Sequence, residues 1–203
     1  MARGEWTDPA RARVSVGVWS REWLTAKAPS LKATTRESYR SLLVGCILPT
    51  WERIPLAAVT HSEVAAWVAR LAATVGPSRC RKSATLLSGI MAAAVRDQRI
   101  PRNPCVGVSL PRLPAQQQRY LSLTQLQALA EEAGDYRLMI LVLGLCGLRF
   151  GECVALRVRS VDLMRRRLSV TEGMSEVNGH LVWSTPKTHR PAMCRCLGRW
   201  LRA

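Results

Sequence analysis

Apolar residues in the first hundred positions recur at intervals of three and four, which predicts a series of amphipathic helices. A first helix is expected within "SVGVWSREWLTAK", with Trp19 and Trp23 on its apolar face. A second helix, "LKATTRESYRSLLVGCILP", is expected to take Thr34 or Thr35 as its N-cap and to end at Pro49.

Two further helices follow with clear start signals. Thr60 precedes Glu63 by three positions, which predicts a capping box ahead of the apolar run "VAAWVARLAA". Gly76-Pro77 predicts a turn, and "SRCRKSATLLSGIMAAAVRDQR" then predicts a helix with a basic first turn. Because this region has little strand signal, residues 12–99 are expected to form a helical domain.

The chain then changes character twice. Residues 100–118 are rich in proline and polar residues, which predicts a linker. Beyond it, Thr124 is expected to cap a helix that ends at Gly134, and "YRLMILVLGLCGL" predicts a buried helix too short to span a bilayer. After "RFGECVALRV" the apolar period falls to two, so "RRRLSVTE" and "HLVWSTPKT" are expected to be antiparallel strands around a turn at Asn178-Gly179.

Basic residues outnumber acidic residues by 30 to 14, which gives a formal net charge of +16. This excess favours a polyanionic partner, and most of the cations are arginines, whose planar guanidinium pairs with phosphate oxygens. GC-rich codon usage is an alternative source of arginine, but it does not explain why acidic residues are so few. The seven cysteines lack metal-ligand spacing, so no metal site is expected, and the N-terminus lacks a signal-peptide pattern.

A short box in the second half of the chain resembles a known family. "LGLCGLRFGECVALRVRSVDL" resembles the first catalytic box of the tyrosine recombinases of the phage integrase family, with Gly-Leu-Arg-x-Gly-Glu after a small turn. The resemblance extends from "LKATTRESYRSLLVGCILPTW" through "RNPCVGVSLPR" to "PKTHR" and is of the actinobacterial type. The expected fold class is mainly α with two domains. A helical, SAM-like core-binding domain would precede residues 119–203, a truncated α+β catalytic domain with a small antiparallel sheet.

The resemblance implies two catalytic residues. Arg149 matches the family's arginine that stabilises the pentavalent phosphorane, and its place at a helix start would add the field of the helix N-terminus. Lys187 matches the lysine that donates a proton to the leaving 5′ oxygen, a role that suits an ammonium whose pKa falls on desolvation. Glu152 is expected to orient the arginine. Plainer alternatives are an ion pair between Arg149 and Glu152 and a solvated hairpin charge at Lys187.

DNA contacts are expected at the basic starts of two helices, because hydroxyl and basic side chains there bind phosphate without reading sequence. A solvated polar face is the alternative for each residue. The expected contacts are Lys32, Thr34, Thr35 and Arg36 in one group and Ser78, Arg79, Arg81 and Lys82 in the other. A further arginine cluster could contact the DNA backbone or lie in a solvent-facing loop, and the loop is favoured. Its members are Arg157, Arg159, Arg165, Arg166 and Arg167.

The resemblance would require further residues after the hairpin: a His-x-x-Arg box, another His or Trp, and a tyrosine nucleophile. Tyr39, Tyr120 and Tyr136 all precede Arg149 and do not match the nucleophile's context. Residues from about 191 lack a strand period and are expected to be an aberrant tail. A frameshift between about His189 and Met193 would explain the tail, and a naturally divergent terminus is the alternative.

The sequence therefore predicts a fragment of a phage integrase, an enzyme of site-specific DNA recombination, that cannot itself cleave DNA and that exposes apolar surface. The alternative is a stand-alone DNA-binding module that competes for recombinase core sites. An unrelated basic regulator is a third hypothesis, although no compact helix-turn-helix stands out. The expected partners are double-stranded DNA and other recombinase protomers, with no membrane, and the expected location is the cytoplasm, in association with the nucleoid.

Overall fold

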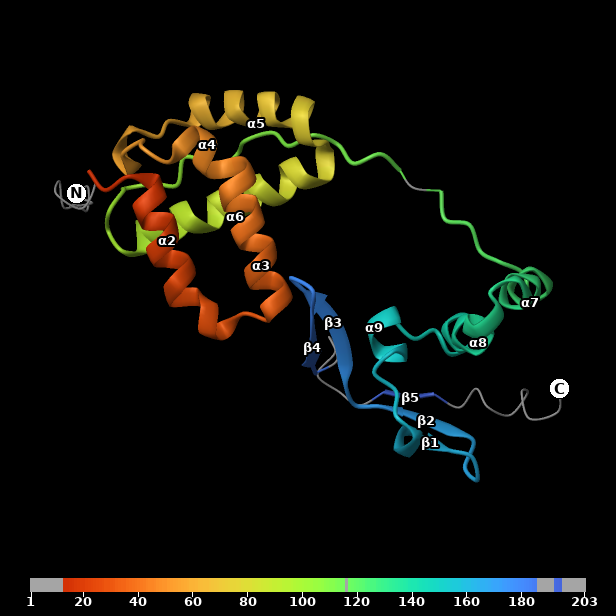
Figure 1. The fold of residues 1–203 in the computed structure, drawn as a ribbon. Helices are drawn as coiled ribbons and strands as arrows, with labels where there is room; N and C mark the ends of the chain where they lie inside the picture. The colour runs from red at the N-terminus through yellow and green to blue at the C-terminus, as the bar shows by residue number, and fades with distance from the viewer. Residues whose placement is uncertain (1–12, 116, 186–191, 195–203) are drawn as a thin grey trace, which may run out of the picture. The chain divides into compact units, whose positions relative to one another are not determined.

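A computed structural model describes residues 13–115, 117–185 and 192–194. The chain divides into two compact units, which are named the helical unit (residues 1–115) and the mixed unit (residues 116–203) (Figure 1). No helix among the described residues is long and apolar enough to cross a membrane.

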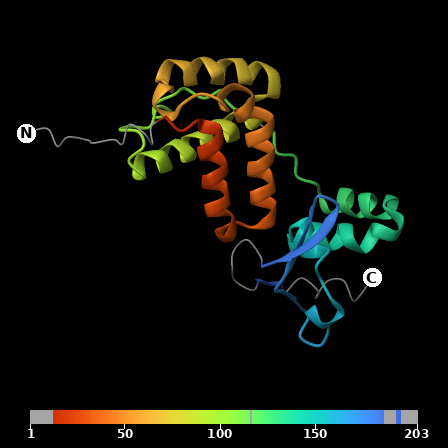
Figure 2. The ribbon, with the colours of Figure 1, turned by 60° about the vertical axis from the view of Figure 1, so that its left-hand side comes forward.

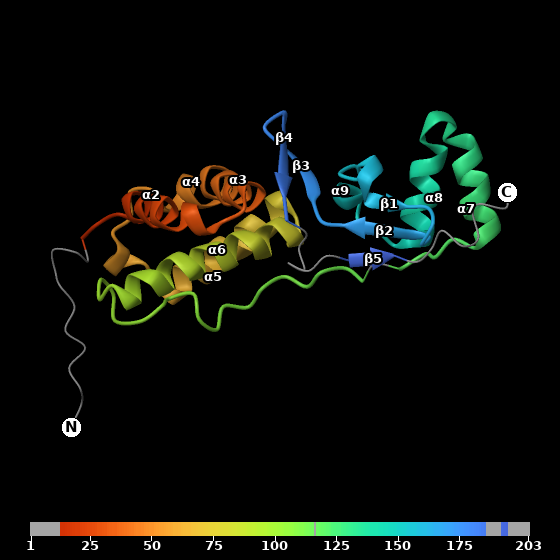
Figure 3. The ribbon, with the colours of Figure 1, turned by 90° about the horizontal axis from the view of Figure 1, so that it is seen from below.

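The helical unit consists of helices joined by short turns. Its elements are α2 (Val16–Lys27), η1 (Ala28–Ser30), α3 (Ala33–Leu42), the π-helical turn η2 (Leu43–Ile47), α4 (Leu48–Trp51), η3 (Leu56–Ala58), α5 (His61–Val75) and α6 (Pro77–Arg96). The helices α2, α3 and α4 lie along one side of α6 (Figure 3), and α5 lies above α2 and α3 in the view of Figure 2.

Local sequence signals determine where α5 begins and where it passes into α6. The Thr60 hydroxyl accepts the Glu63 N–H at 3.3 Å and the Glu63 carboxylate accepts the Thr60 N–H at 3.0 Å, so the predicted capping box is confirmed. Gly76 has a φ of 76°, in the region that favours glycine, and Pro77 is the first residue of α6. The predicted Gly-Pro turn is therefore the junction between the two helices.

The second predicted helix differs from its expectation at both ends. Lys32 is the N-cap of α3, so Thr34 and Thr35 lie inside the first turn and the predicted caps are wrong. A side-chain cap is worth only about 1 kcal/mol, so packing of the apolar face decides where the helix starts. Pro49 does not end the helical path, because it lies in the first turn of α4, which runs on to Trp51. A proline loses no hydrogen bond there, since first-turn N–H groups have no partner within their helix.

One apolar core holds the helical unit together. Leu87, Ile90 and Met91 are fully buried in α6. Trp51 and Trp67 pack edge to face against each other, with ring centroids 6.1 Å apart. Because each buried side chain of this size contributes roughly 1.5–3 kcal/mol, the helical unit has an extensive core of its own.

The chain beyond α6 stays attached to the helical unit. Ile100 is buried, and Cys105, Val108 and Leu110 pack against the same core. This segment, residues 101–113, is named the strap, and it lies within the range predicted as a linker.

In the mixed unit, two helices pack against each other closely. The elements of this unit are α7 (Leu123–Glu132), η4 (Gly134–Tyr136), α8 (Arg137–Cys146), α9 (Phe150–Cys153), η5 (Val158–Ser160), β1 (Val161–Asp162), β2 (Arg167–Val170), β3 (Gly173–Val177), β4 (His180–Ser184) and β5 (Ala192–Cys194). A Cβ at Gly144 of α8 would lie 2.5 Å from Leu126 Cδ2 of α7. The predicted Thr124 cap is wrong: the Ser122 hydroxyl accepts the Gln125 N–H at 3.2 Å, because Ser122 and Gln125 form the capping box.

The strands form two small antiparallel sheets, ordered β1-β2-β5 and β3-β4. Asn178 and Gly179 have φ angles of 51° and 78°, so the predicted hairpin turn is confirmed. The predicted pairing of "RRRLSVTE" with "HLVWSTPKT" is wrong, because a two-residue turn pairs β4 with the strand directly before it, which is β3. The expected absence of a strand after residue 191 is also wrong for Ala192–Cys194, whose backbone pairs with β2.

Candidate nucleic-acid interface

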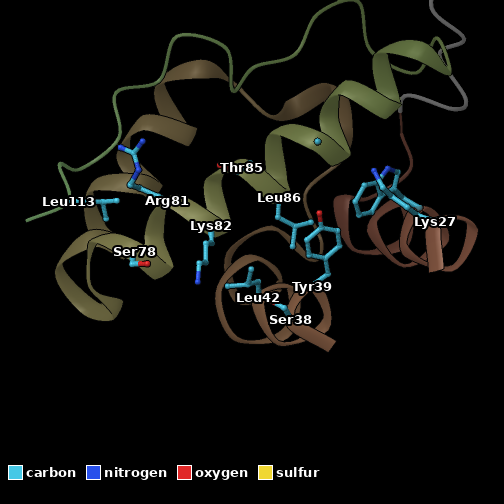
Figure 4. A pocket seen from close by; sticks show the side chains of 12 residues that line it. Lys27, Ser38, Tyr39, Leu42, Ser78, Arg81, Lys82, Thr85, Leu86 and Leu113 are labelled. Atoms are coloured by element: carbon cyan, nitrogen blue, oxygen red, sulfur yellow. The ribbon is translucent and has the colours of Figure 1, made fainter. Parts of the chain in front are cut away.

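A groove of about 530 Å³ lies on the helical unit and is lined mainly by α2, α3 and α6 (Figure 4). A smaller recess of about 380 Å³ shares Ser38, Leu42, Ser78 and Lys82 with it, so the two form one surface, named the α3–α6 groove. The larger recess is lined by Trp23, Lys27, Ser38, Tyr39, Leu42, Ser78, Arg81, Lys82, Thr85, Leu86, Gly89 and Leu113. The smaller recess adds Ser41, Val75, Gly76, Pro77 and Arg79.

The α3–α6 groove carries positive charge and no carboxylate among its described lining residues. Lys27, Arg81 and Lys82 line the larger recess, and Arg79 lines the smaller one. Lys82 is exposed and points from α6 toward α3 (Figure 4). A concave surface that is lined by cations and by no carboxylate attracts polyanions.

Two of the predicted contact residues are held by other parts of the helical unit. Arg79 Nε donates to Cys46 Sγ at 3.4 Å and its Nη2 donates to the Ser41 hydroxyl at 3.3 Å. Arg81 Nη1 donates to the Pro111 carbonyl oxygen of the strap at 3.1 Å. A guanidinium has five N–H donors, so each arginine can still donate to a phosphate oxygen. Both, however, also have structural roles that the sequence does not reveal.

Three groove residues are not predicted from the sequence as part of an interface. The rings of Trp23 and Tyr39 stack with centroids 6.0 Å apart, and Lys27 Nζ lies 4.9 Å from the Trp23 ring. The spacing of four between Trp23 and Lys27 places both on one face of α2, and this signal could have identified them. Tyr39 is expected from the pattern only as part of an apolar face.

The other predicted contact group lies at the start of α3. Thr34 and Arg36 are exposed, Lys32 and Thr35 are half-buried, and none of them lines either recess of the groove. The part of α3 that lines the groove is its C-terminal half, through residues 38–42. The two predicted groups therefore do not meet in one recess.

In the mixed unit, Arg149 follows a tight turn and begins a one-turn helix. Gly147 has a φ of 63° and is the left-handed C-cap of α8, and Arg149 is the N-cap of α9. The Glu152 carboxylate accepts the Arg149 N–H at 2.9 Å and also accepts from Nη1 at 2.8 Å. The backbone N–H first, and the guanidinium after it, hold the pKa of Glu152 below its usual value, against the opposing effect of burial.

The Arg149 side chain remains accessible in spite of this pair. It is 58% exposed, whereas the Glu152 side chain is 12% exposed, so the guanidinium retains donors that face solvent. The ion pair named as the plain alternative is thus present, and it leaves room for a phosphate ligand. The predicted contribution of a helix N-terminus is small, because α9 spans a single turn. Lys187 lies outside the described residues.

A glycine beside Arg149 allows α9 to approach the sheet. A Cβ at Gly151 would lie 2.4 Å from the Met174 carbonyl oxygen of β3, which is closer than atoms can come. Only glycine therefore lets this turn lie against β3, and the approach helps to fix the place of Arg149.

Several arginines of the predicted cluster already have partners. Arg157 lies 4.5 Å from the Trp183 ring and 3.5 Å from a Glu172 carboxylate oxygen. Arg165 forms an ion pair with Asp162 at 3.8 Å. The remaining members are Arg159 and Arg166, which are exposed, and Arg167, which is half-buried in β2. Among the described residues, no group of three His, Cys, Asp or Glu side chains could hold a metal ion.

Solved structures identify the class to which this fold belongs. The Tn1549 transposon integrase in complex with transposon right end DNA is similar with a TM-score of 0.80 at 16% identity, over 90% of this chain and 61% of that chain. A lambda integrase dimer bound to a COC′ core site is similar with a TM-score of 0.68 at 16% identity, over 85% of this chain and 62% of that chain. The fold is that of these tyrosine recombinases: a helical core-binding domain followed by α+β catalytic-domain elements with small antiparallel sheets.

Sequence comparison finds similarity to phage integrases. Residues 16–109 match the phage integrase central domain. The integrase of Mycobacterium phage L5 is 28% identical over 197 residues, which are 91% of this chain and 52% of that protein. A prophage phiRv2 integrase of Mycobacterium tuberculosis H37Rv is 30% identical over 175 residues, which are 85% of this chain and 46% of that protein. The chain spans about half the length of these curated relatives, and its sequence matches lie in the phage integrase family.

Proposed function

We propose that this chain binds double-stranded DNA through the α3–α6 groove, as the DNA-gripping part of a site-specific recombinase. The observation that carries the proposal is a concave surface with four basic side chains and no carboxylate among its described lining residues, in a chain of net charge +16. The Tn1549 and lambda integrases whose fold it shares were solved with DNA bound, which supports the same class of ligand.

Binding through this surface is mainly to phosphate. Lys82 and Ser78 are exposed on the first two turns of α6, and no side chain caps the N–H groups at its start. Ammonium, hydroxyl and free backbone N–H groups all donate to phosphate oxygens, and none of these contacts depends on base sequence. The predicted group at the start of α3, with Arg36 exposed, would supply a second and separate contact.

Arg149 is the residue of the mixed unit that we assign to the scissile phosphate. Its exposed guanidinium would stabilise charge on the phosphorane oxygens while Glu152 fixes its orientation. Lys187 would donate a proton to the leaving 5′ oxygen. In the whole reaction a tyrosine attacks the phosphodiester, forms a 3′-phosphotyrosine and is displaced by a 5′ hydroxyl, without a metal or nucleotide cofactor. The 203 residues contain no His-x-x-Arg sequence and no matching tyrosine, so we propose that they bind DNA without cleaving it.

The partners of this chain would be DNA and other recombinase protomers. The lambda integrase structures that share the fold include a dimer on a core site and a tetramer on a Holliday junction. A chain that occupies core sites without cleaving them would compete with an intact recombinase for those sites. Its location would be the bacterial nucleoid.

Replacement of Lys82 by Gln tests the role of the groove. The variant Arg70→Gln is the matched control. Arg70 is an exposed residue of α5 outside both recesses, so its replacement removes one positive charge without changing the groove. We expect Lys82→Gln to weaken binding to a 30-base-pair duplex by about five- to tenfold at roughly 0.1 M salt and to lower the slope of log K against log salt by about 0.9.

The control variant should change affinity by less than twofold and leave the salt slope nearly as it is. Equal losses in both variants would mean that net charge, rather than the groove, determines binding. An unchanged affinity in Lys82→Gln would place the DNA on another surface and overturn the proposal.

A further inference from the structure

The strap is held firmly at the end where it leaves α6. The Asn103 amide donates to the Ser88 carbonyl oxygen at 3.0 Å, and its oxygen accepts the Cys105 N–H at 2.9 Å. His61 Nδ1 lies 3.1 Å from the Pro104 carbonyl oxygen, within hydrogen-bond distance. Two of these contacts join the first residues of the strap to α5 and α6, and the bond between Asn103 and Cys105 fixes the turn within the strap.

The middle of the strap is held by apolar packing. Cys105, Val108 and Leu110 are half-buried against a surface that includes Val64 and Ala84. Burial raises the pKa of the Cys105 thiol to about 12, as expected for a side chain packed away from water. This packing ends at Leu110.

The exit end of the strap depends on one side chain. Arg81 Nη1 donates to the Pro111 carbonyl oxygen, and among the described residues this is the hydrogen bond that joins residues 109–113 to the helices. Arg112 and Leu113 are exposed, so they contribute little packing of their own. Arg81 lies on the side of α6 along which the strap runs, whereas Lys82 points toward α3 (Figure 4).

We propose that Arg81 is a positioning residue that clasps the exit end of the strap to α6 and so fixes where the connection to the mixed unit begins. Every residue from the strap to α7 lies on the single covalent path between the two units. If residues 111–113 came away from α6, about three residues would be added to that path, which is roughly 10 Å of extended chain. The clasp therefore limits the length of free chain that connects the two units. This role is independent of whether the groove binds DNA.

Trypsin cleavage of the full chain without DNA tests the clasp, because the strap contains its own reporter bond. Cleavage after Arg112 requires the exit end to open, whereas cleavage after Arg119, an exposed residue outside the strap, gives an internal reference rate. Cleavage after Arg102 reports on the end held by Asn103. The rates are measured by mass spectrometry for the wild type, Arg81→Gln, Arg81→Lys and Lys82→Gln.

We expect Arg81→Gln to raise the rate of cleavage after Arg112, relative to the rate after Arg119, by about five- to tenfold. This increase corresponds to the loss of one charge-assisted hydrogen bond. The rate after Arg102 should stay unchanged, and Arg81→Lys should restore part of the protection because an ammonium can donate to the same carbonyl. Lys82→Gln should match the wild type.

If the ratio of the cleavage rates after Arg112 and Arg119 were the same in Arg81→Gln as in the wild type, the proposal would be overturned. If cleavage after Arg112 became equally faster in Lys82→Gln, the cause would be the charge of the groove and not the bond from Arg81 to Pro111, and the proposal would be wrong. Faster cleavage at all three bonds in Arg81→Gln would show that Arg81 supports the whole fold and is not a clasp.

Discussion

The helical unit and the mixed unit bury their apolar residues to very different extents. In the helical unit, side chains from α2 to α6 form one buried cluster that includes Leu87, Ile90 and Met91 at 0% exposure. In the described part of the mixed unit, the cluster between α7 and α8 buries Leu126, Ala130 and Leu141. Outside this cluster, Ala155, Leu168 and Val170 are buried.

The mixed unit also exposes large apolar side chains. Leu138 is 68% exposed, Phe150 is 63% exposed and Met164 is 94% exposed. Large apolar side chains are therefore exposed in the described part of this unit. The candidate DNA groove therefore lies on a unit with a large buried core, whereas Arg149 lies in a unit whose described core is small.

Truncation of a buried side chain should show the largest difference in stability between the two units. Leu87→Ala empties a fully buried site in α6 and should cost about 3–4 kcal/mol of unfolding free energy, because the surrounding helices cannot close the cavity. Leu141→Ala, at 2% exposure in a small cluster, should cost about 2 kcal/mol. Urea denaturation followed by far-ultraviolet circular dichroism measures both, and equal costs would contradict the contrast between the units.

Glycine substitutions should have smaller effects of opposite sign. Gly151→Ala places a Cβ 2.4 Å from the Met174 carbonyl oxygen, so α9 must move from β3 at a cost of about 1–3 kcal/mol. Gly89→Ala in α6 meets nothing within 4 Å and should stabilise the helical unit by about 0.5–1 kcal/mol, since alanine loses less backbone entropy. Thermal unfolding measures each change, and a neutral Gly151→Ala would show that α9 does not need this close approach.

The smallest effects should come from the two capping carboxylates. Hydrogen bonds from Thr60 lower the pKa of Glu63, and hydrogen bonds from Arg149 lower the pKa of Glu152. A lowered folded-state pKa gives stability that is present above the unfolded value of 4.5 and is lost as the pH falls through the folded value. Glu63→Gln and Glu152→Gln should each therefore flatten the acid side of the stability profile, in the helical and the mixed unit respectively. A melting temperature that falls below pH 5 as steeply in both variants as in the wild type would contradict this assignment.

Local signals in the sequence predict much of the fold. The capping box at Thr60 and the turn at Asn178-Gly179 are confirmed, because both depend on residues only a few positions apart. The caps at Thr124 and near Thr34, the end at Pro49 and the strand pairing are wrong, because tertiary packing and competing local motifs decide them.

The candidate sites show the same limit. Arg149 and Glu152 are close in sequence, so their pairing could be anticipated as an alternative. The meeting of Trp23 with Tyr39, and of Arg81 with Pro111, joins residues far apart in the chain. No pattern of local spacing reveals such contacts.

The most direct test of the central claim is hydrogen exchange of the whole chain, measured by mass spectrometry with and without duplex DNA. If the α3–α6 groove binds DNA, exchange should slow in peptides from the first turns of α6 and from the C-terminal half of α3, while peptides from the middle of α5 should not change. Protection confined to the mixed unit, or absent from the start of α6 under conditions where the DNA is bound, would contradict the account.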